Sequence, residues 1–386
     1  MEVKIVLGYA FGDEGKGVTV QWLCKKAIEG GKRPLVVRFS GGPQAAHTIN
    51  NGGIEHICSS FGSGVLLGVP TYLNHNVYVD PISLVKELEV LNSKGTKPNI
   101  CASWMCKVIT PYDVLAGQKN AKVLSDGTCG KGIYSTFDRY KSSEKVQPQF
   151  FINYQDESGP EYHLHMASQY HNLERIDDYD NMYKSAIEKL RPYITHQGML
   201  GKNLENYDVL IFEGSQGLLL DMACGFYPHV TPSRTGLNGI DAKYLHGAEV
   251  YLVTRTYTTR HGNGYEPKHK LDWDLSDKHE TNIHNEFQGD FKVGALEVDL
   301  LNRASERHRL DNYKAEFNLK YNLVITHMDL PMKYWDFECH NGDRYNHWIG
   351  GGLTPQKVAQ FITNYLDIPM DRVYYNDSIE SNIKEV

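Results

Sequence analysis

The stretch Gly8–Gly17, which reads GYAFGDEGKG, combines glycine with side chains that bind anions or move protons. Glycines let backbone N–H groups approach an anion closely, and the ammonium of Lys16 can reach a phosphate. The carboxylates of Asp13 and Glu14 suit a loop that also binds a divalent cation or accepts a proton. The spacing fits neither GxxxxGK[ST] nor GxGxxG. We therefore expect a site for a phosphate-bearing ligand of another kind, although a glycine-rich turn with solvated charges remains an alternative.

A second glycine-containing stretch, Ser40–Thr48, reads SGGPQAAHT. His47 follows small residues that would not shield it from a ligand. Near neutral pH an imidazole can donate a proton or stabilise a developing oxyanion. An isolated histidine is more often structural, so both roles stay open for His47 at this point.

Three further stretches carry polar groups suited to nucleotides. In Glu213–Gly217 (EGSQG), Gln216 offers both a donor and an acceptor to the edge of a base, and Thr231 lies on the next turn. Asp126–Gly132 (DGTCGKG) resembles another anion-binding loop. Asp329 could accept hydrogen bonds from guanine or, as a common alternative, cap a helix.

The elements that must position these groups are short apolar runs rich in β-branched residues. Such continuous runs are typical of strands buried on both faces, as in parallel sheets. They are Val3–Leu7, Pro34–Phe39, Val209–Phe212, Val250–Val253 and Leu323–Ile325. Helical patterns lie at Val18–Glu29 and Pro355–Tyr365. The order predicts an α/β fold with a mostly parallel, doubly wound central sheet and smaller peripheral subdomains, whose ligands bind beyond the carboxyl ends of the strands.

Composition narrows the classes of function. The 386 residues include 40 Lys and Arg against 47 Asp and Glu, a formal net charge of −7. Without a basic excess we expect no nucleic-acid partner, whereas a nucleotide needs only one local pocket. No apolar run approaches about 18 residues, and Met1–Ile5 does not begin a secretory signal, so we expect no membrane association. Seven scattered cysteines indicate reduced thiols and a cytoplasmic location.

Taken together, the motifs resemble those of the adenylosuccinate synthetase family. Gly12–Gly17 matches its GDEGKG letter for letter, and Gly41–Thr48 matches GGxxAGHT except at Ala46. Glu213–Asp221 matches EGAQGxLLD except at Ser215. Weaker similarities lie at Tyr227–Thr231, Thr128–Ile133 and Thr326–Leu330. Because the matches follow one another along nearly the whole chain, we expect residues 1–386 to form a single domain of this kind.

The resemblance implies a ligase that uses a nucleoside triphosphate and Mg²⁺ to phosphorylate O6 of a 6-oxopurine nucleotide, after which the amine of L-aspartate displaces the phosphate. In that reaction Asp13 takes the N1 proton and binds Mg²⁺, and His47 donates to O6 or to the phosphoryl group. Lys16 holds phosphates and Gln216 holds O6, so the implied catalytic residues are these four. The backbone carbonyl of Ala46 is a second metal ligand.

The resemblance also assigns binding residues. The implied triphosphate site contains Gly12, Asp13, Glu14, Gly15, Lys16, Gly17, Ala46, His47, Thr48, His327 and Asp329. The implied purine-nucleotide site contains Asp13, Lys16, Gln44, Ala45, Ala46, His47, Thr128, Cys129, Arg139, Gln216 and Thr231. The implied aspartate site contains Gln288, Gly289, Lys292 and Arg255.

Some family residues are replaced. The arginine cluster of the aspartate loop is missing from Asn285–Glu297, where Lys292 is the only cation, so Arg255 and Arg260 are candidates for the aspartate carboxylates. An arginine that family members contribute to the partner subunit is Ser143 here, so either Arg139 or Lys141 replaces it or the contact is lost. The usual guanine-recognition residues near the C-terminus are also replaced, so ATP becomes a candidate donor beside GTP.

Several replacements, together with Gln44 and the segment HVTPSRTG, resemble a phage branch of the family that acts on dGMP to make the precursor of 2-aminoadenine for phage DNA. Asp13 instead resembles the ordinary enzymes that use IMP and GTP. We expect dGMP to be the substrate, with IMP as the alternative and a catalytically inactive nucleotide sensor as a different class. The family further implies a homodimer, in the host cytoplasm if the protein is viral.

Overall fold

The computed structural model describes most of the chain. It covers residues 1–103, 105–120, 129–142, 158–191, 206–268, 287, 289–328, 334–339, 343–348, 354–378 and 380–386. Among the residues assigned to sites from the sequence, Thr128, Gln288 and Asp329 lie outside these ranges, so their assignments remain predictions.

A nine-stranded sheet forms the centre of the described structure, in the order β17-β16-β13-β10-β1-β9-β2-β5-β7. All neighbouring strands in it are parallel except β16 and β17. In chain order the strands are β1 (Glu2–Gly8), β2 (Pro34–Arg38), β5 (Thr71–Leu73), β7 (Ile100–Ala102), β9 (Val209–Gly217), β10 (Glu249–Arg255), β13 (Lys320–Thr326), β16 (Arg372–Tyr375) and β17 (Lys384–Glu385). The predicted α/β class with a mostly parallel sheet is therefore confirmed.

The five strands predicted from apolar runs are all present, and their burial explains why the runs are continuous. Every residue of β2 is buried, as are the last six residues of β13. The predicted strand at Val209–Phe212 is longer than expected, because β9 continues through the EGSQG motif to Gly217. Glu213 and Ser215 are buried there, so polar side chains occupy strand positions inside the molecule.

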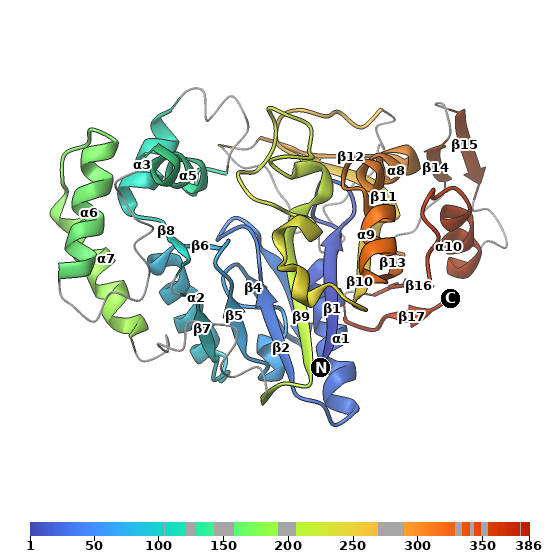
Figure 1. Cartoon of the computed structure of the whole chain (residues 1–386), viewed down its shortest axis with the longest axis horizontal. Helices are drawn as coiled ribbons and strands as arrows, with labels where there is room; N and C mark the ends of the chain where they lie inside the picture. The colour runs from blue at the N-terminus through green and yellow to red at the C-terminus, as the bar shows by residue number, and fades with distance from the viewer. Residues whose placement is uncertain are drawn as a thin grey trace.

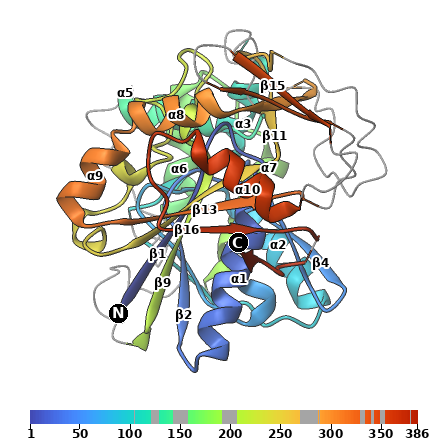
Figure 2. The same ribbon diagram turned by 90° about the vertical axis from the view of Figure 1, so that its right-hand side faces the viewer.

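Helices pack around the sheet, as Figures 1 and 2 show. Helix α1 (Lys16–Glu29) is the next element after β1, and it begins two residues earlier than its apolar pattern predicts. Helix α2 (Pro81–Ser93) begins at an Asp80 cap, and α3 (Pro111–Lys119) begins with a capping box between Thr110 and Asp113. The other helices are α5 (Ile133–Ser142), α6 (Ser158–Tyr170), α7 (Asp177–Leu190), α8 (Val298–Arg307), α9 (Leu310–Phe317) and α10 (Pro355–Asn364).

Smaller groups of elements flank the central sheet. Helices α3, α5, α6 and α7 lie at the left of Figure 1, beyond the short strands β6 (Tyr78–Val79) and β8 (Lys107–Val108). A four-stranded sheet, β11-β12-β14-β15, lies above the right half. Its strands are β11 (Tyr257–His261), β12 (Phe291–Glu297), β14 (Tyr334–Cys339) and β15 (Asp343–Trp348), and β3 (His47–Asn51) pairs with β4 (Ile54–Cys58) as a hairpin.

The expectations about membrane-spanning helices and about the cysteines can be compared with the described residues. No helix among them has the length and apolar character needed to cross a bilayer. The cysteines whose side chains are described are free thiols, as expected: Cys24, Cys58, Cys101, Cys106, Cys129 and Cys224.

The end of β9 lies in close contact with the loop between β1 and α1, residues 9–15, which we call the first loop. A Cβ atom on Gly217 would lie 2.2 Å from the carbonyl oxygen of Ala10 and 2.5 Å from the amide nitrogen of Gly12, so backbone would have to move. We expect Gly217→Ala to lower the free energy of unfolding by roughly 1–3 kcal/mol in urea denaturation. The control is Gly30→Ala, since Gly30 has a negative φ and room for a methyl group. Equal stability of the two variants would contradict this packing.

Candidate active site at the carboxyl ends of the strands

The loop after β1 is held in an unusual backbone conformation by neighbouring strands. Gly12, Asp13 and Gly15 have φ values of 99°, 58° and 88°, and a non-glycine residue in this region is commonly found where function requires it. Thr259 Oγ1 donates to the Gly12 carbonyl (3.0 Å), and Thr326 Oγ1 donates to the Glu14 carbonyl (2.9 Å). Two strands therefore preform the loop at the positive end of α1.

Two oppositely charged side chains of this loop are buried beneath it. A Cβ atom on Gly8 would lie 2.2 Å from Glu14 Oε2 and 3.0 Å from Lys16 Nζ, so both side chains lie over the same glycine. Glu14 Oε1 accepts from the Ala10 amide (2.6 Å), whereas Oε2 is buried without a hydrogen-bond partner. Burial raises the pKa of Glu14 to about 7 and lowers the pKa of Lys16, although each charge favours the other.

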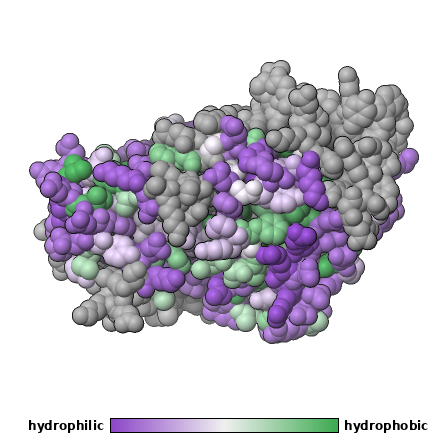
Figure 3. All heavy atoms as spheres, turned by 90° about the horizontal axis from the view of Figure 1, so that it is seen from above, coloured by the Kyte–Doolittle hydropathy of each residue, from purple (hydrophilic) through white to green (hydrophobic). Residues whose placement is uncertain are grey.

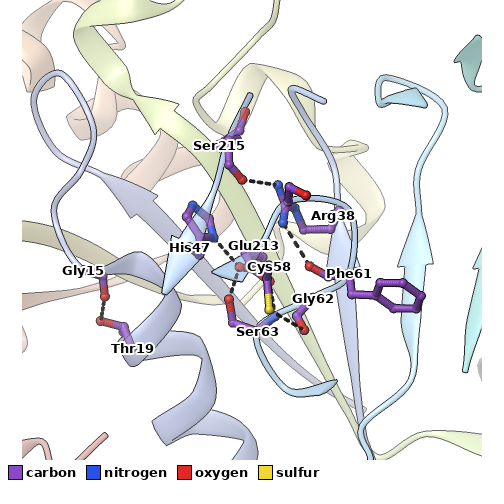
Figure 4. A network of polar contacts seen from close by, with 12 residues as sticks. Gly15, Thr19, Arg38, His47, Cys58, Phe61, Gly62, Ser63, Glu213 and Ser215 are labelled. Atoms are coloured by element: carbon purple, nitrogen blue, oxygen red, sulfur yellow. Dashed lines mark hydrogen bonds and ion pairs between the residues drawn. The ribbon is translucent and has the colours of Figure 1, made fainter. Parts of the chain in front are cut away.

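His47 is oriented by a buried carboxylate (Figure 4). Its Nδ1 lies 2.5 Å from Glu213 Oε1, and the side chain of Glu213 is completely buried. Ser63 donates to the same carboxylate through its amide (2.9 Å) and its hydroxyl group. Since Nδ1 is engaged, Nε2 is the ring nitrogen of His47 that remains for a ligand.

The charge states of this pair follow from its surroundings. Burial alone would raise the pKa of Glu213, but the hydrogen bond from His47 and the charge of Arg38 lower it to about 2. Burial lowers the pKa of His47 despite Glu213. In the ligand-free protein at neutral pH we therefore expect an ionised Glu213 and a neutral His47 whose proton is on Nδ1. His47 can donate from Nε2 only after gaining a second proton, which the negative charge of a bound phosphate would favour.

A cleft of about 790 Å³ of empty space, part of it open to solvent, lies beside these residues. Its lining comes from six separate parts of the chain and includes Gln44, Cys129, Gln216, Thr231 and Arg260. A concave site with several converging polar side chains is typical of small-molecule sites. Figure 3 views the molecule from the side on which the central strands end, and its coloured residues are mostly hydrophilic with smaller hydrophobic patches.

The structure thus brings most of the sequence-predicted nucleotide residues together. Gln44, Cys129, Gln216 and Thr231 line the cleft. Ala45 is buried and its carbonyl accepts from Arg38 (3.2 Å), while Ala46 is exposed. Gly17 lies in the first turn of α1, and Thr48 follows His47 in β3.

Arg139 lies apart from the residues that line the cleft. Its guanidinium makes two hydrogen bonds of 2.8 Å to Asp113 and a third, of 2.9 Å, to the Val108 carbonyl. His171 also reaches Asp113 (2.9 Å). A contact between Arg139 and a nucleotide would require this buried ion pair to be broken, so the position favours a structural role for Arg139.

The residues expected to bind aspartate lie in two groups. Arg255 donates through Nε to the Asp13 carbonyl and through Nη1 to the Tyr257 hydroxyl. Lys292 forms an ion pair with Glu266, and the Gly289 carbonyl lies 3.2 Å from His261 Nε2. Both predicted cations are therefore engaged by the protein itself.

The end of β13 approaches the first loop on the side predicted to bind the triphosphate. The hydroxyl of Thr326 lies 2.8 Å from His327 Nδ1, and burial lowers the pKa of His327. The amide of Met328 donates to the carbonyl of Asn376 (3.0 Å), just after β16. The segments that carry the predicted donor-recognition residues therefore lie next to each other.

Sequence reasoning missed three residues that build the site: Glu213, Ser63 and Arg38. Glu213 was noticed only as part of the EGSQG motif, although a charged residue directly after a fully apolar strand could have indicated a buried carboxylate. Arg38 could have been found in the same way at the end of β2, where it is buried. Ser63 carries no signal in a single sequence.

The chain resembles a known protein family over most of its length. Residues 5–311 match the sequence pattern of the family described as adenylosuccinate synthetase. The chain belongs to the adenylosuccinate synthetase family. The adenylosuccinate synthetase of Saccharophagus degradans is 34% identical over 283 residues, which cover 68% of this chain. The matched part spans 64% of that relative, slightly less than two thirds of its length.

Two solved structures of related proteins share the fold. A fully ligated adenylosuccinate synthetase from Plasmodium falciparum has a TM-score of 0.75 at 20% identity and is covered to 99%, as is this chain. The succinoaminodeoxyadenylate synthetase (PurZ) of cyanophage S-2L, bound to dGMP and dATP, has a TM-score of 0.66 at 13% identity, covering 100% of this chain and 95% of the other. At these identities the likenesses establish the fold alone.

The Glu213 carboxylate predicts a pH-dependent stability difference. The pKa of Glu213 in the folded protein is about 2, below its ordinary value of 4.5. Its charge therefore stabilises the fold fully above about pH 4.5, by about 3 kcal/mol, and this contribution disappears as the pH falls towards 2. We expect Glu213→Gln to lower the free energy of unfolding at pH 7 and the difference from wild type to shrink steadily below pH 4.5. Urea denaturation at several pH values measures this, and a constant difference would contradict the buried, ionised carboxylate.

Proposed function

We propose that the protein is a C–N ligase that joins L-aspartate to a 6-oxopurine nucleotide with hydrolysis of a nucleoside triphosphate. Membership of the adenylosuccinate synthetase family supports this. The observation that carries the proposal is the grouping of Asp13, Lys16, His47 and Gln216 around the first loop and the adjoining cleft. These four residues supply a proton acceptor, two cationic or proton-donating groups and an amide that can bind the edge of a base.

In the first step Asp13 accepts the N1 proton of the purine, so that O6 becomes nucleophilic. O6 forms a bond to the γ-phosphorus and the nucleoside diphosphate leaves. The amide of Gln216 donates to O6, and the protonated His47 donates from Nε2 to the transferring phosphoryl group. Lys16 and the loop amides stabilise the phosphate oxygens.

In the second step the amine of L-aspartate attacks C6 and inorganic phosphate leaves with O6. Phosphorylation makes this possible because an oxygen bound at C6 is otherwise a poor leaving group. The amine nitrogen loses its surplus proton as the new C–N bond replaces the C–O bond. The products are a succinylated 6-aminopurine nucleotide, a nucleoside diphosphate and phosphate.

A Mg²⁺ ion fits the donors at the first loop. Carboxylate and carbonyl oxygens are ligands that Mg²⁺ prefers, together with phosphate and water. The Asp13 carboxylate has no hydrogen-bond or ion-pair partner among the described residues, and Ala46 is exposed, so Asp13 and the Ala46 carbonyl would hold the ion. When bound, Mg²⁺ neutralises charge on the triphosphate.

We further propose that the purine substrate is dGMP, giving 2-amino-2′-deoxyadenylosuccinate for phage 2-aminoadenine DNA. The replacements that resemble the phage branch support this choice, and one feature of the cleft adds to them. Gln44 lines the cleft, and its side-chain oxygen is buried without a hydrogen-bond partner. Guanine carries a 2-amino donor that hypoxanthine lacks, so an unused acceptor beside the base favours guanine.

IMP with GTP is the second candidate, because Asp13 is the residue found in ordinary adenylosuccinate synthetases. The cyanophage synthetase, which has a similar fold, binds dGMP and dATP, and this supports dGMP as the first candidate. By analogy with the family we also propose a homodimer built from one domain per chain, acting in the cytoplasm of the host cell if the protein is viral.

The catalytic assignments predict large losses of turnover. We expect Asp13→Asn and His47→Ala each to reduce kcat by roughly two to four decades, because a positioned proton acceptor or oxyanion donor is lost. Phosphate release is measured with dGMP or IMP, L-aspartate, Mg²⁺ and ATP or GTP, and each omission should abolish it. The control is Asp311→Asn, an exposed carboxylate on α9. Nucleotide binding by wild type without turnover under any combination would instead favour the inactive sensor.

The substrate assignment predicts a selectivity change. With dGMP and IMP competing at equal concentration, we expect wild type to convert dGMP preferentially. Gln44→Leu should lower kcat/KM for dGMP roughly ten- to a hundredfold while IMP is affected less, since only dGMP loses a hydrogen bond. Gln216→Leu is the matched control, because it should lower kcat/KM for both substrates. A preference for IMP in wild type would replace dGMP by the second candidate.

A further inference from the structure

Arg260 is a nearly buried cation in the wall of the cleft. It lies on β11, its side chain is only 5% exposed, and it lines the cleft together with Gln216 and Thr231. Its guanidinium also lies over the ring of Phe11, 5.2 Å from the centroid. Since Phe11 belongs to the first loop, the charge is held between that loop and the cleft.

The guanidinium of Arg260 has no counter-ion of its own among the residues that the structure describes. Nη2 donates to the backbone carbonyls of Asn263 and His229, while Nε is buried without a hydrogen-bond partner. Within the described ranges no carboxylate lies within 4 Å of it. By contrast, the buried Arg139 has Asp113 as a counter-ion.

Such an arrangement is costly unless an anion completes it. A buried charge that is paired only with neutral carbonyl groups loses hydration without regaining an opposite charge. Burial lowers the pKa of Arg260 to about 10, although Asp13 opposes this shift, so the group remains cationic at neutral pH. The cleft therefore presents a positive charge with unused donor capacity beside the first loop.

The other cations considered for the aspartate carboxylates are already engaged. Arg255 donates to the Asp13 carbonyl and to Tyr257, and its guanidinium lies over the rings of Tyr257 and Phe291. Lys292 is paired with Glu266. Neither is part of the described cleft lining, which leaves Arg260 as the arginine in that lining.

We propose that Arg260 binds a carboxylate of the amino-acid substrate and so directs its amine to the purine. This inference rests on the proposed function, in which Gln216 and Asp13 face the C6 edge of the base. The carboxylates of an amino acid lie only a few bonds from the attacking nitrogen, whereas the 5′-phosphate is separated from C6 by the base and the sugar. A cation beside Gln216 is therefore better placed for the carboxylate, and a guanidinium can bind it through two parallel hydrogen bonds.

The test compares substitutions of Arg260 in the full-length protein. We expect Arg260→Gln to raise the KM for L-aspartate roughly ten- to a hundredfold, as expected for a lost charge-assisted hydrogen bond. The KM for the purine nucleotide, and its dissociation constant measured by calorimetry without aspartate, should change by less than about threefold. Arg260→Lys keeps the charge and should recover part of the affinity for aspartate.

Arg33→Gln is the matched control, because it removes an exposed guanidinium that is paired with Asp208 and lies outside the described cleft lining; its KM for aspartate should stay close to that of wild type. Thermal unfolding of each variant establishes that it is folded. An unchanged aspartate KM in folded Arg260→Gln would overturn the inference, and so would weaker nucleotide binding with an unchanged aspartate KM, which would assign Arg260 to the phosphate. Absence of turnover in wild type would instead reject the proposed function.

Discussion

A single buried carboxylate organises the candidate active site at the carboxyl ends of the strands. Glu213 is completely shielded from water, so its charge is tolerable only with several donors around it. Those donors come from β3 and from the segment after β4, and the charge of Arg38 adds to them from β2. The orientation of the His47 ring, and with it the nitrogen available to a ligand, therefore depends on an interaction at the end of β9.

Other charged side chains, around the first loop, are buried as well. Glu14 and Lys16 are both buried over Gly8, Arg255 is engaged by a loop carbonyl, and Arg260 has no counter-ion among the described residues. Each group loses hydration on burial, and Glu14 and Arg260 each keep one buried polar atom without a hydrogen-bond partner among the described residues. Anionic and metal-bound ligands would complete these interactions, so the electrostatics of the empty site already favour the ligands of the proposed reaction.

The sequence alone predicted the parallel sheet and most of the residues at its carboxyl edge. The apolar runs at β1, β2, β9, β10 and β13 carry a strong signal because both faces of these strands are buried. It could not reveal that His47 is paired with Glu213, since that contact joins residues 166 positions apart. Likewise the ion pairs of Arg139 and Lys292 depend on which side chains meet in space, and an isolated cation in a sequence gives no sign of its partner.

The threonine hydroxyls that hold the first loop have a consequence for how ligands associate. Thr259 and Thr326 fix the carbonyls of Gly12 and Glu14 before any phosphate arrives. Little backbone freedom is therefore left to be lost when a nucleotide binds, and more of the gross interaction energy is retained as affinity. Selectivity between the proposed nucleotides would accordingly come from side chains around the base, because the loop that would hold their phosphates is the same for all of them.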